Sequence, residues 1–176
     1  CMLLNNPTDY SVNEIVGSCL NSLQDNNQTS IALYNYFGHN TALKATATLP
    51  FSSKRKLSAV TFEEIGTIAI GAPEFVLQSL PEKISRIINQ YASMGLRVLM
   101  IAHSNGKLAG DRLPSGFKPL AIVSIADNIR DDAAQTIRWF KENDVAIKII
   151  SGDNPVTVAE VARRVGVSNA DKYISL

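Results

Sequence analysis

The sequence predicts an α/β protein in which a mixed, mostly antiparallel sheet with helices is followed by a partial, doubly wound parallel α/β segment. Short stretches rich in Ala, Val, Thr and Ile, separated by short turns, lie between residues 44 and 70 and are typical of antiparallel hairpins. From residue 120 to 165, apolar strands alternate with helices, which is typical of a buried parallel sheet. Glycines and prolines concentrate between these regions. We therefore expect two domains, residues 1–113 and 114–176, of which the second is partial.

In the first region, residues 1–113, the sequence pattern predicts four helices and four strands. Apolar residues between Asp9 and Asp25 recur in steps of three and four, which indicates an amphipathic helix, and Thr29 to Phe37 indicates a second one. The expected strands are residues 44–49, 56–62, 67–70 and 97–102, and the remaining helices are residues 73–79 and 81–94. Both of these helices begin with Pro, which suits a first helical turn because its missing N–H has no partner there.

The second region predicts strands at residues 120–126 and 145–150 and helices at residues 131–143 and 155–165. Both expected strands are almost continuously apolar, as in a sheet covered on both faces. Two parallel strands are too few to form a sheet of this type by themselves.

Composition and charge exclude several classes of protein. The chain has 176 residues, of which 45% are hydrophobic and 19% are charged, so we expect a globular protein. A net charge of +1 gives no electrostatic attraction to nucleic acid. No apolar run approaches the roughly 18 residues that span a bilayer, and no signal peptide is recognisable. Two cysteines without a CxxC pair predict no disulfide framework, and isolated His39 and His103 predict no metal site.

The strongest chemical pattern is the expected turn from strand to helix at Ser151-Gly152-Asp153-Asn154-Pro155. Gly152 permits a tight turn, and either Asp153 or Asn154 can cap the helix that follows. The unpaired N–H groups of a helix start suit a phosphate, and the Ser151 hydroxyl lies at the carboxyl end of the strand, where ligands of α/β sheets bind. An ordinary capped turn explains the same residues.

Five segments resemble motifs of the P-type ATPases, in that family's order. Residues 151–157 are similar to TGDNPxT, and residues 125–133 resemble a stretch with D-P-x-R-x-x-A. Residues 51–56 resemble F-S-S-x-R-K, residues 71–74 resemble the end of K-G-A-P-E, and residues 95–99 resemble G-x-R-V-L. This resemblance covers most of the chain. It implies a nucleotide-binding domain followed by part of a haloacid-dehalogenase-like phosphorylation domain.

The resemblance implies a role for each matching residue. Phe51 would stack on adenine, Arg97 would reach the phosphates, and Ser151 with Gly152 would hold the transferring phosphoryl group. The nucleotide-binding set implied by the family is Phe51, Arg55, Lys56, Gly71, Arg97, Asp127, Arg130 and Asp153. ATP would be the substrate, with Mg²⁺ in the intact pump.

Each assignment has a structural alternative. Phe51 is also explained as a core residue beside Pro50, and the basic residues that follow it as a solvated turn. Gly71 is explained by a strand-to-helix turn, and Arg97 by a surface position. A salt bridge between domains explains Asp127 and Arg130.

The sequence departs from the family's pattern at several positions. Ile70 stands where the family has Lys, Ser30 where an acidic residue contacts adenine, Asn128 where Pro is usual, and Ser151 where Thr is commoner. We therefore expect weak nucleotide binding. The D-K-T-G-T motif with the phosphorylated Asp and the metal-binding G-D-G-x-N-D segment are absent from the 176 residues. We expect no catalytic residue and no metal ligand here, and no ATP hydrolysis by this chain alone.

The implied partners are ATP and the rest of the same pump polypeptide: its membrane, actuator and remaining phosphorylation domains. We expect a cytoplasmic location on the cell membrane and coupling of ATP hydrolysis to cation transport; the sequence does not specify the ion. Two other functions would account for parts of the same sequence. A haloacid-dehalogenase-like phosphatase needs a D-x-D motif, which is absent. A non-catalytic nucleotide-binding or interaction module would explain both the missing nucleophile and Ile70.

Overall fold

The computed structural model describes residues 1–126 and 129–174. The predicted class, α/β with a mostly antiparallel sheet, is confirmed. The strands are β1 (Met2–Leu3), β2 (Ala45–Leu49), β3 (Leu57–Phe62), β4 (Gly66–Gly71), β5 (Leu96–Ser104) and β6 (Lys118–Ala126). The helices are α1 (Val12–Leu23), α2 (Gln28–Phe37), α3 (Pro73–Val76), α4 (Glu82–Ser93), α5 (Ala133–Glu142) and α6 (Pro155–Arg164).

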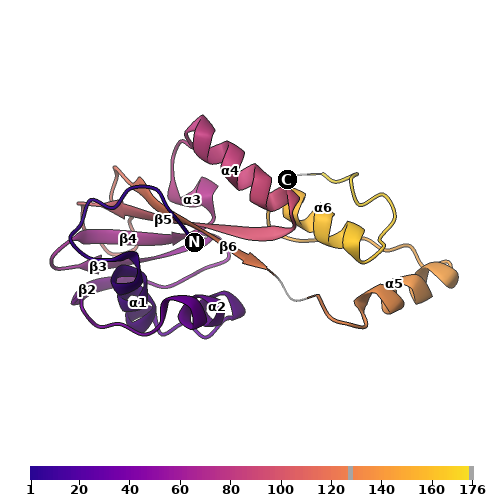
Figure 1. The fold of residues 1–176 in the computed structure, drawn as a ribbon, viewed down its shortest axis with the longest axis horizontal. Helices are drawn as coiled ribbons and strands as arrows, with labels where there is room; N and C mark the ends of the chain where they lie inside the picture. The colour runs from indigo at the N-terminus through magenta and orange to yellow at the C-terminus, as the bar shows by residue number, and fades with distance from the viewer. Residues whose placement is uncertain (127–128, 175–176) are drawn as a thin grey trace. The chain divides into compact units, whose positions relative to one another are not determined.

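The strands form a six-stranded sheet in the order β1-β6-β5-β4-β3-β2 (Figure 1). The pairs β1–β6, β2–β3, β3–β4 and β4–β5 are antiparallel. The β3–β4 hairpin is in register from Leu57 opposite Gly71 to Phe62 opposite Gly66, and every residue of both strands is buried. Most residues of these strands are small or β-branched, which suits a sheet covered on both faces. The centre of the core therefore lies in this hairpin.

Helix α1 packs against β2 and β3 and lies beside α2. Its start is a capping box, in which the Ser11 hydroxyl accepts a hydrogen bond from the Glu14 N–H and the Glu14 carboxylate accepts one from the Ser11 N–H. The Ser11 hydroxyl also donates to the Glu14 carboxylate, and this bond, together with the one from the Ser11 N–H, holds the pKa of Glu14 below its usual value. The helix buries Ile15, Val16 and Cys19 completely, so its apolar face is part of the core.

By compactness the described residues form two units. Unit 1 comprises residues 1–80 and 99–123, and unit 2 comprises residues 81–98 and those from 124 onward. The domain division at residue 113 stays a prediction. No helix in the described residues is both long enough and apolar enough to cross a bilayer.

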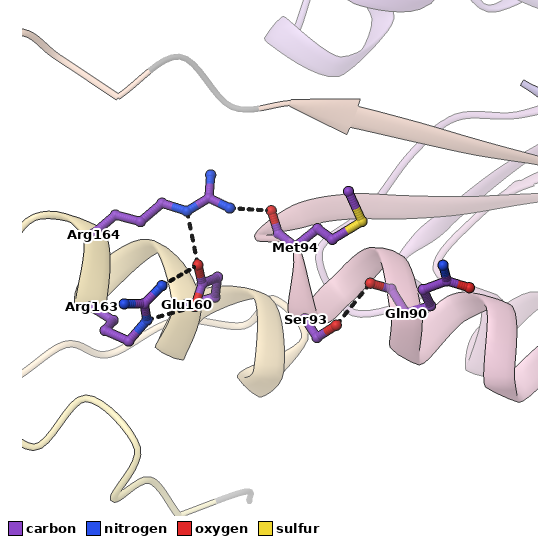
Figure 2. A network of polar contacts seen from close by, with 6 residues as sticks. All are labelled: Gln90, Ser93, Met94, Glu160, Arg163 and Arg164. Atoms are coloured by element: carbon purple, nitrogen blue, oxygen red, sulfur yellow. Dashed lines mark hydrogen bonds and ion pairs between the residues drawn. The ribbon is translucent and has the colours of Figure 1, made fainter.

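In unit 2, α4 packs against α6 through a polar network (Figure 2). The Glu160 carboxylate accepts two hydrogen bonds from Arg163, both of 2.9 Å, and one of 3.0 Å from Arg164. Arg164 also donates to the Met94 carbonyl at the end of α4. These two guanidinium groups hold the pKa of Glu160 at about 2. Arg164 thereby gives the Met94 carbonyl a hydrogen-bond partner, which the carbonyls at the C-terminus of a helix lack within the helix itself.

The expectations for the second region need correction. Residues 120–126 do form a strand, but it is part of β6 in the mostly antiparallel sheet, next to β1 and β5. Residues 145–150 are irregular, and Ile150 is 96% exposed. A strand forms only where neighbouring strands pair with its N–H and C=O groups, and this segment has no such neighbour among the described residues. Helix α3 is also shorter than expected, because it ends at Val76.

Candidate functional site

The first group of predicted residues lies on the turn between β2 and β3. Phe51 is 49% exposed, so it is not a core residue. The turn is closed by hydrogen bonds from the Arg55 N–H to the Ser52 hydroxyl (3.1 Å) and from the Lys56 N–H to the Ser52 carbonyl (2.8 Å). Sequence reasoning did not single out Ser52. A serine in such a turn is itself a signal, because its hydroxyl bonds to nearby backbone groups. The turn thus presents an aromatic ring to solvent beside two basic residues.

Gly71 ends β4 beside the start of β3, and this places it next to the turn. It lies opposite Leu57 in the sheet, and the neighbouring Ala72 N–H donates to the Lys56 carbonyl at 2.9 Å. A Cβ on Gly71 would lie 2.4 Å from both the Leu57 Cβ and the Lys56 carbonyl oxygen. Only glycine fits where the two strands approach this closely. The structure therefore brings Phe51, Arg55, Lys56 and Gly71 to one end of the hairpin.

The two departures from the family's pattern in unit 1 are both buried. Ile70 is 6% exposed and lies in β4 opposite Ser58 and Ile101. Ser30 is also 6% exposed, and its N–H donates to the Asn27 side chain that caps α2. Neither side chain carries a charge, so neither offers a nucleotide an ionic partner.

The second group lies in unit 2, at the start of α6. Arg97 donates to the Asp153 carboxylate at 2.9 Å, so two residues predicted to bind nucleotide form an ion pair with each other. The Ser151 hydroxyl accepts a hydrogen bond from the Asp153 N–H at 3.1 Å. The Thr157 hydroxyl donates to the Leu96 carbonyl at 3.1 Å and ties α6 to the start of β5. The fold thereby joins Arg97, Ser151 and Asp153.

The N-cap of α6 is Asn154 rather than Asp153. Its side-chain oxygen accepts from the N–H groups of Val156 (3.0 Å) and Thr157 (3.4 Å). These are two of the N–H groups that a phosphate at this helix start would use. In this structure the helix supplies its own acceptor at that position.

Arg130 belongs to neither group. It forms a two-pronged ion pair with Asp132, with distances of 3.0 and 2.7 Å. The pairing raises the pKa of Arg130 and lowers the pKa of Asp132. Asp127, the predicted partner of Arg130 at the domain junction, lies outside the described residues.

A cavity of about 560 Å³ lies at the other end of the β3–β4 hairpin. Charged residues in its lining are Asp9, Glu63, Glu64 and Lys107, and it also includes His103. The His103 Nε2 lies 2.6 Å from the Ile65 carbonyl oxygen. None of the residues predicted to bind nucleotide lines this cavity. Within residues 1–126 and 129–174, no three His, Cys, Asp or Glu side chains are grouped so that they could hold a metal ion.

Comparison with known proteins identifies the family. Residues 33–174 match the haloacid dehalogenase-like hydrolases. The chain belongs to this family. The chain is similar to "Probable cation-transporting ATPase exp7" of Streptococcus pneumoniae, to which it is 36% identical over 169 residues. That alignment covers 94% of this chain and 21% of the relative.

Two further relatives carry related names. "Calcium-transporting ATPase CtpE" of Mycolicibacterium smegmatis is 36% identical over 123 residues, which are 70% of this chain and 15% of the relative. "Calcium-transporting ATPase 1" of Yarrowia lipolytica is 27% identical over 171 residues, covering 80% of this chain and 18% of the relative. This haloacid dehalogenase-like chain thus spans about a fifth of its relatives' length or less. The resemblance to P-type cation-transporting ATPases is confirmed.

Proposed function

We propose that this chain binds ATP as part of a P-type ATPase that couples ATP hydrolysis, through an aspartyl-phosphate, to cation transport across a membrane. The names of the relatives and the haloacid dehalogenase-like family support the pump. In this proposal the chain faces the cytoplasm, and its partners are ATP and the remaining domains of the same polypeptide. The phosphorylated Asp belongs to those other domains, because no D-K-T-G-T motif occurs here.

The observation that carries the proposal is the exposed ring of Phe51 on a hydrogen-bonded turn. An aromatic ring offers a base a flat apolar surface, and stacking on it contributes roughly 1–3 kcal/mol per base. Arg55 and Lys56 follow in the same turn, and Gly71 adjoins it. In this proposal the adenine binds to this surface of unit 1.

We assign the phosphates to Arg97 and Ser151 in unit 2, with Gly152 and Asp153 beside them. Arg97 is paired with Asp153, but a guanidinium has five N–H groups and can serve a phosphate as well as a carboxylate. Asp127 and Arg130 complete the proposed set. The G-D-G-x-N-D segment is absent from the 176 residues, and among the described residues no three His, Cys, Asp or Glu side chains are grouped so that they could hold a metal ion. We therefore assign Mg²⁺ to ligands outside this chain.

Titration calorimetry with ATP tests the proposal. We expect a dissociation constant above 1 μM, because Ile70 and Ser30 provide no charge, and a loss of about tenfold in affinity for Phe51→Ala. Tyr36→Ala is the matched control, because Tyr36 is an aromatic residue of unit 1 that is 62% exposed on α2. Unchanged affinity of the Phe51 variant would refute the proposed site, and submicromolar binding by the wild type would refute the expected weakness.

A further inference from the structure

Pro50 and Ser52, the residues on either side of Phe51, both accept hydrogen bonds from Arg55. The Arg55 Nη2 donates to the carbonyl of Pro50 at 3.0 Å. On the other side, the Ser52 hydroxyl and carbonyl accept from the N–H groups of Arg55 and Lys56. Phe51 itself points its ring outward and is 49% exposed. The turn therefore fixes the backbone of Phe51 while leaving the ring accessible.

The guanidinium of Arg55 lies against the turn. Its Nε is buried and has no hydrogen-bond partner among the described residues, and its Nη2 contacts Pro50. A buried N–H without an acceptor is unfavourable, and an arginine extended into water would avoid this cost. The neighbouring Lys54 is exposed and, in the described part of the chain, its side chain makes no hydrogen bond or ion pair. Of these two adjacent cations, only Arg55 is engaged with the turn.

We propose that Arg55 is a positioning residue that holds Phe51 ready to stack on the adenine base, rather than a ligand of the phosphates. This inference rests on the proposed function, since it requires that Phe51 bind a base. A side chain and loop that are ordered before binding need not be immobilised by the ligand, and this ordering commonly changes affinity by about 3- to 10-fold. Arg55 thereby strengthens binding of the adenine base and not of the phosphates.

Calorimetry with three ligands separates the two roles. Adenosine carries only the base and sugar, tripolyphosphate carries only the charge, and ATP carries both. For Arg55→Ala we expect adenosine and ATP to lose affinity by the same factor, about 3- to 10-fold, and tripolyphosphate to be unaffected. In a Phe51→Ala background, Arg55→Ala should change adenosine binding no further, because the ring to be positioned is absent. Lys54→Ala is the control for charge in the same turn and should leave adenosine affinity unchanged.

The opposite pattern would overturn the inference: tripolyphosphate weakened by Arg55→Ala while adenosine is unaffected shows a phosphate ligand. A wild-type chain that binds neither adenosine nor ATP instead refutes the proposed function.

A second experiment tests the positioning role without any nucleotide. The NMR order parameter of the Phe51 amide should fall by about 0.2 in the ligand-free Arg55 variant, from the range of rigid backbone. An unchanged order parameter rejects the positioning role. If Arg55→Ala does not fold, Arg55→Gln is used, and the same outcomes decide.

Discussion

Gly71→Ala tests the close approach of β3 and β4 beside the proposed adenine site. The added Cβ would lie 2.4 Å from the Leu57 Cβ and from the Lys56 carbonyl oxygen, whereas ordinary contacts begin at 3.4 Å. The two strands must therefore separate by about 1 Å at a point where both are buried and hydrogen-bonded. Overpacking of this kind typically costs about 1–3 kcal/mol, and we expect the upper end because backbone atoms are among those displaced. The Ala72 N–H to Lys56 carbonyl bond would be disturbed too.

Thermal unfolding followed by circular dichroism measures this cost. For a chain of this length, about 3 kcal/mol corresponds to a fall in Tm of roughly 6–12 °C. Gly110→Ala is the control, because Gly110 has φ +61° and nothing within 4 Å of the position of a Cβ. Gly110→Ala should be destabilised only by the strain of placing alanine in a left-handed backbone conformation, which costs about 1–2 kcal/mol. A Tm for Gly71→Ala within 2 °C of wild type would refute the steric reasoning.

Two further predictions concern acid stability and catalysis. The pKa of Glu160 is held at about 2, mainly by Arg163 and then by Arg164. The stability that this carboxylate adds is complete above its ordinary pKa of 4.5 and is lost as the pH falls toward 2. Glu160→Gln should therefore lower Tm at pH 7 and lower it much less at pH 2, and a difference that is independent of pH contradicts this. The chain alone should release no phosphate from ATP, because the acceptor Asp is absent. Mg²⁺-dependent turnover that follows the concentration of purified chain would show otherwise.

Local patterns in the sequence were sufficient for most elements of the fold. The runs that become β2, β3 and β4 alternate with short turns, and the period of three and four between Asp9 and Asp25 identifies α1. The capping box of Ser11 and Glu14 fixes where α1 begins, and its two residues are only three positions apart in the sequence. In the same way Asn154 begins α6 through bonds to its immediate neighbours. These features are predictable because the interacting groups are adjacent in the chain.

The candidate site was predictable only as a set of residues. The motifs named Phe51, Gly71 and Arg97, but the sequence did not show that the first would be exposed and the second confined by Leu57. Nor did it show that Arg97 would pair with Asp153, because the two residues are 56 positions apart. Contacts over such distances depend on how the helices and strands pack, and no local pattern encodes that packing.

By itself, the sequence determined the class of fold, the family and the composition of the turns, because these depend on residue types and short spacings. Only the tertiary structure decided which strands pair. An apolar run predicts a strand, but whether it becomes one depends on a neighbour that can accept its hydrogen bonds. Residues 120–126 have such neighbours in β1 and β5, and they join the sheet as part of β6. Residues 145–150 have none among the described residues, and they remain irregular and largely exposed despite an equally apolar sequence.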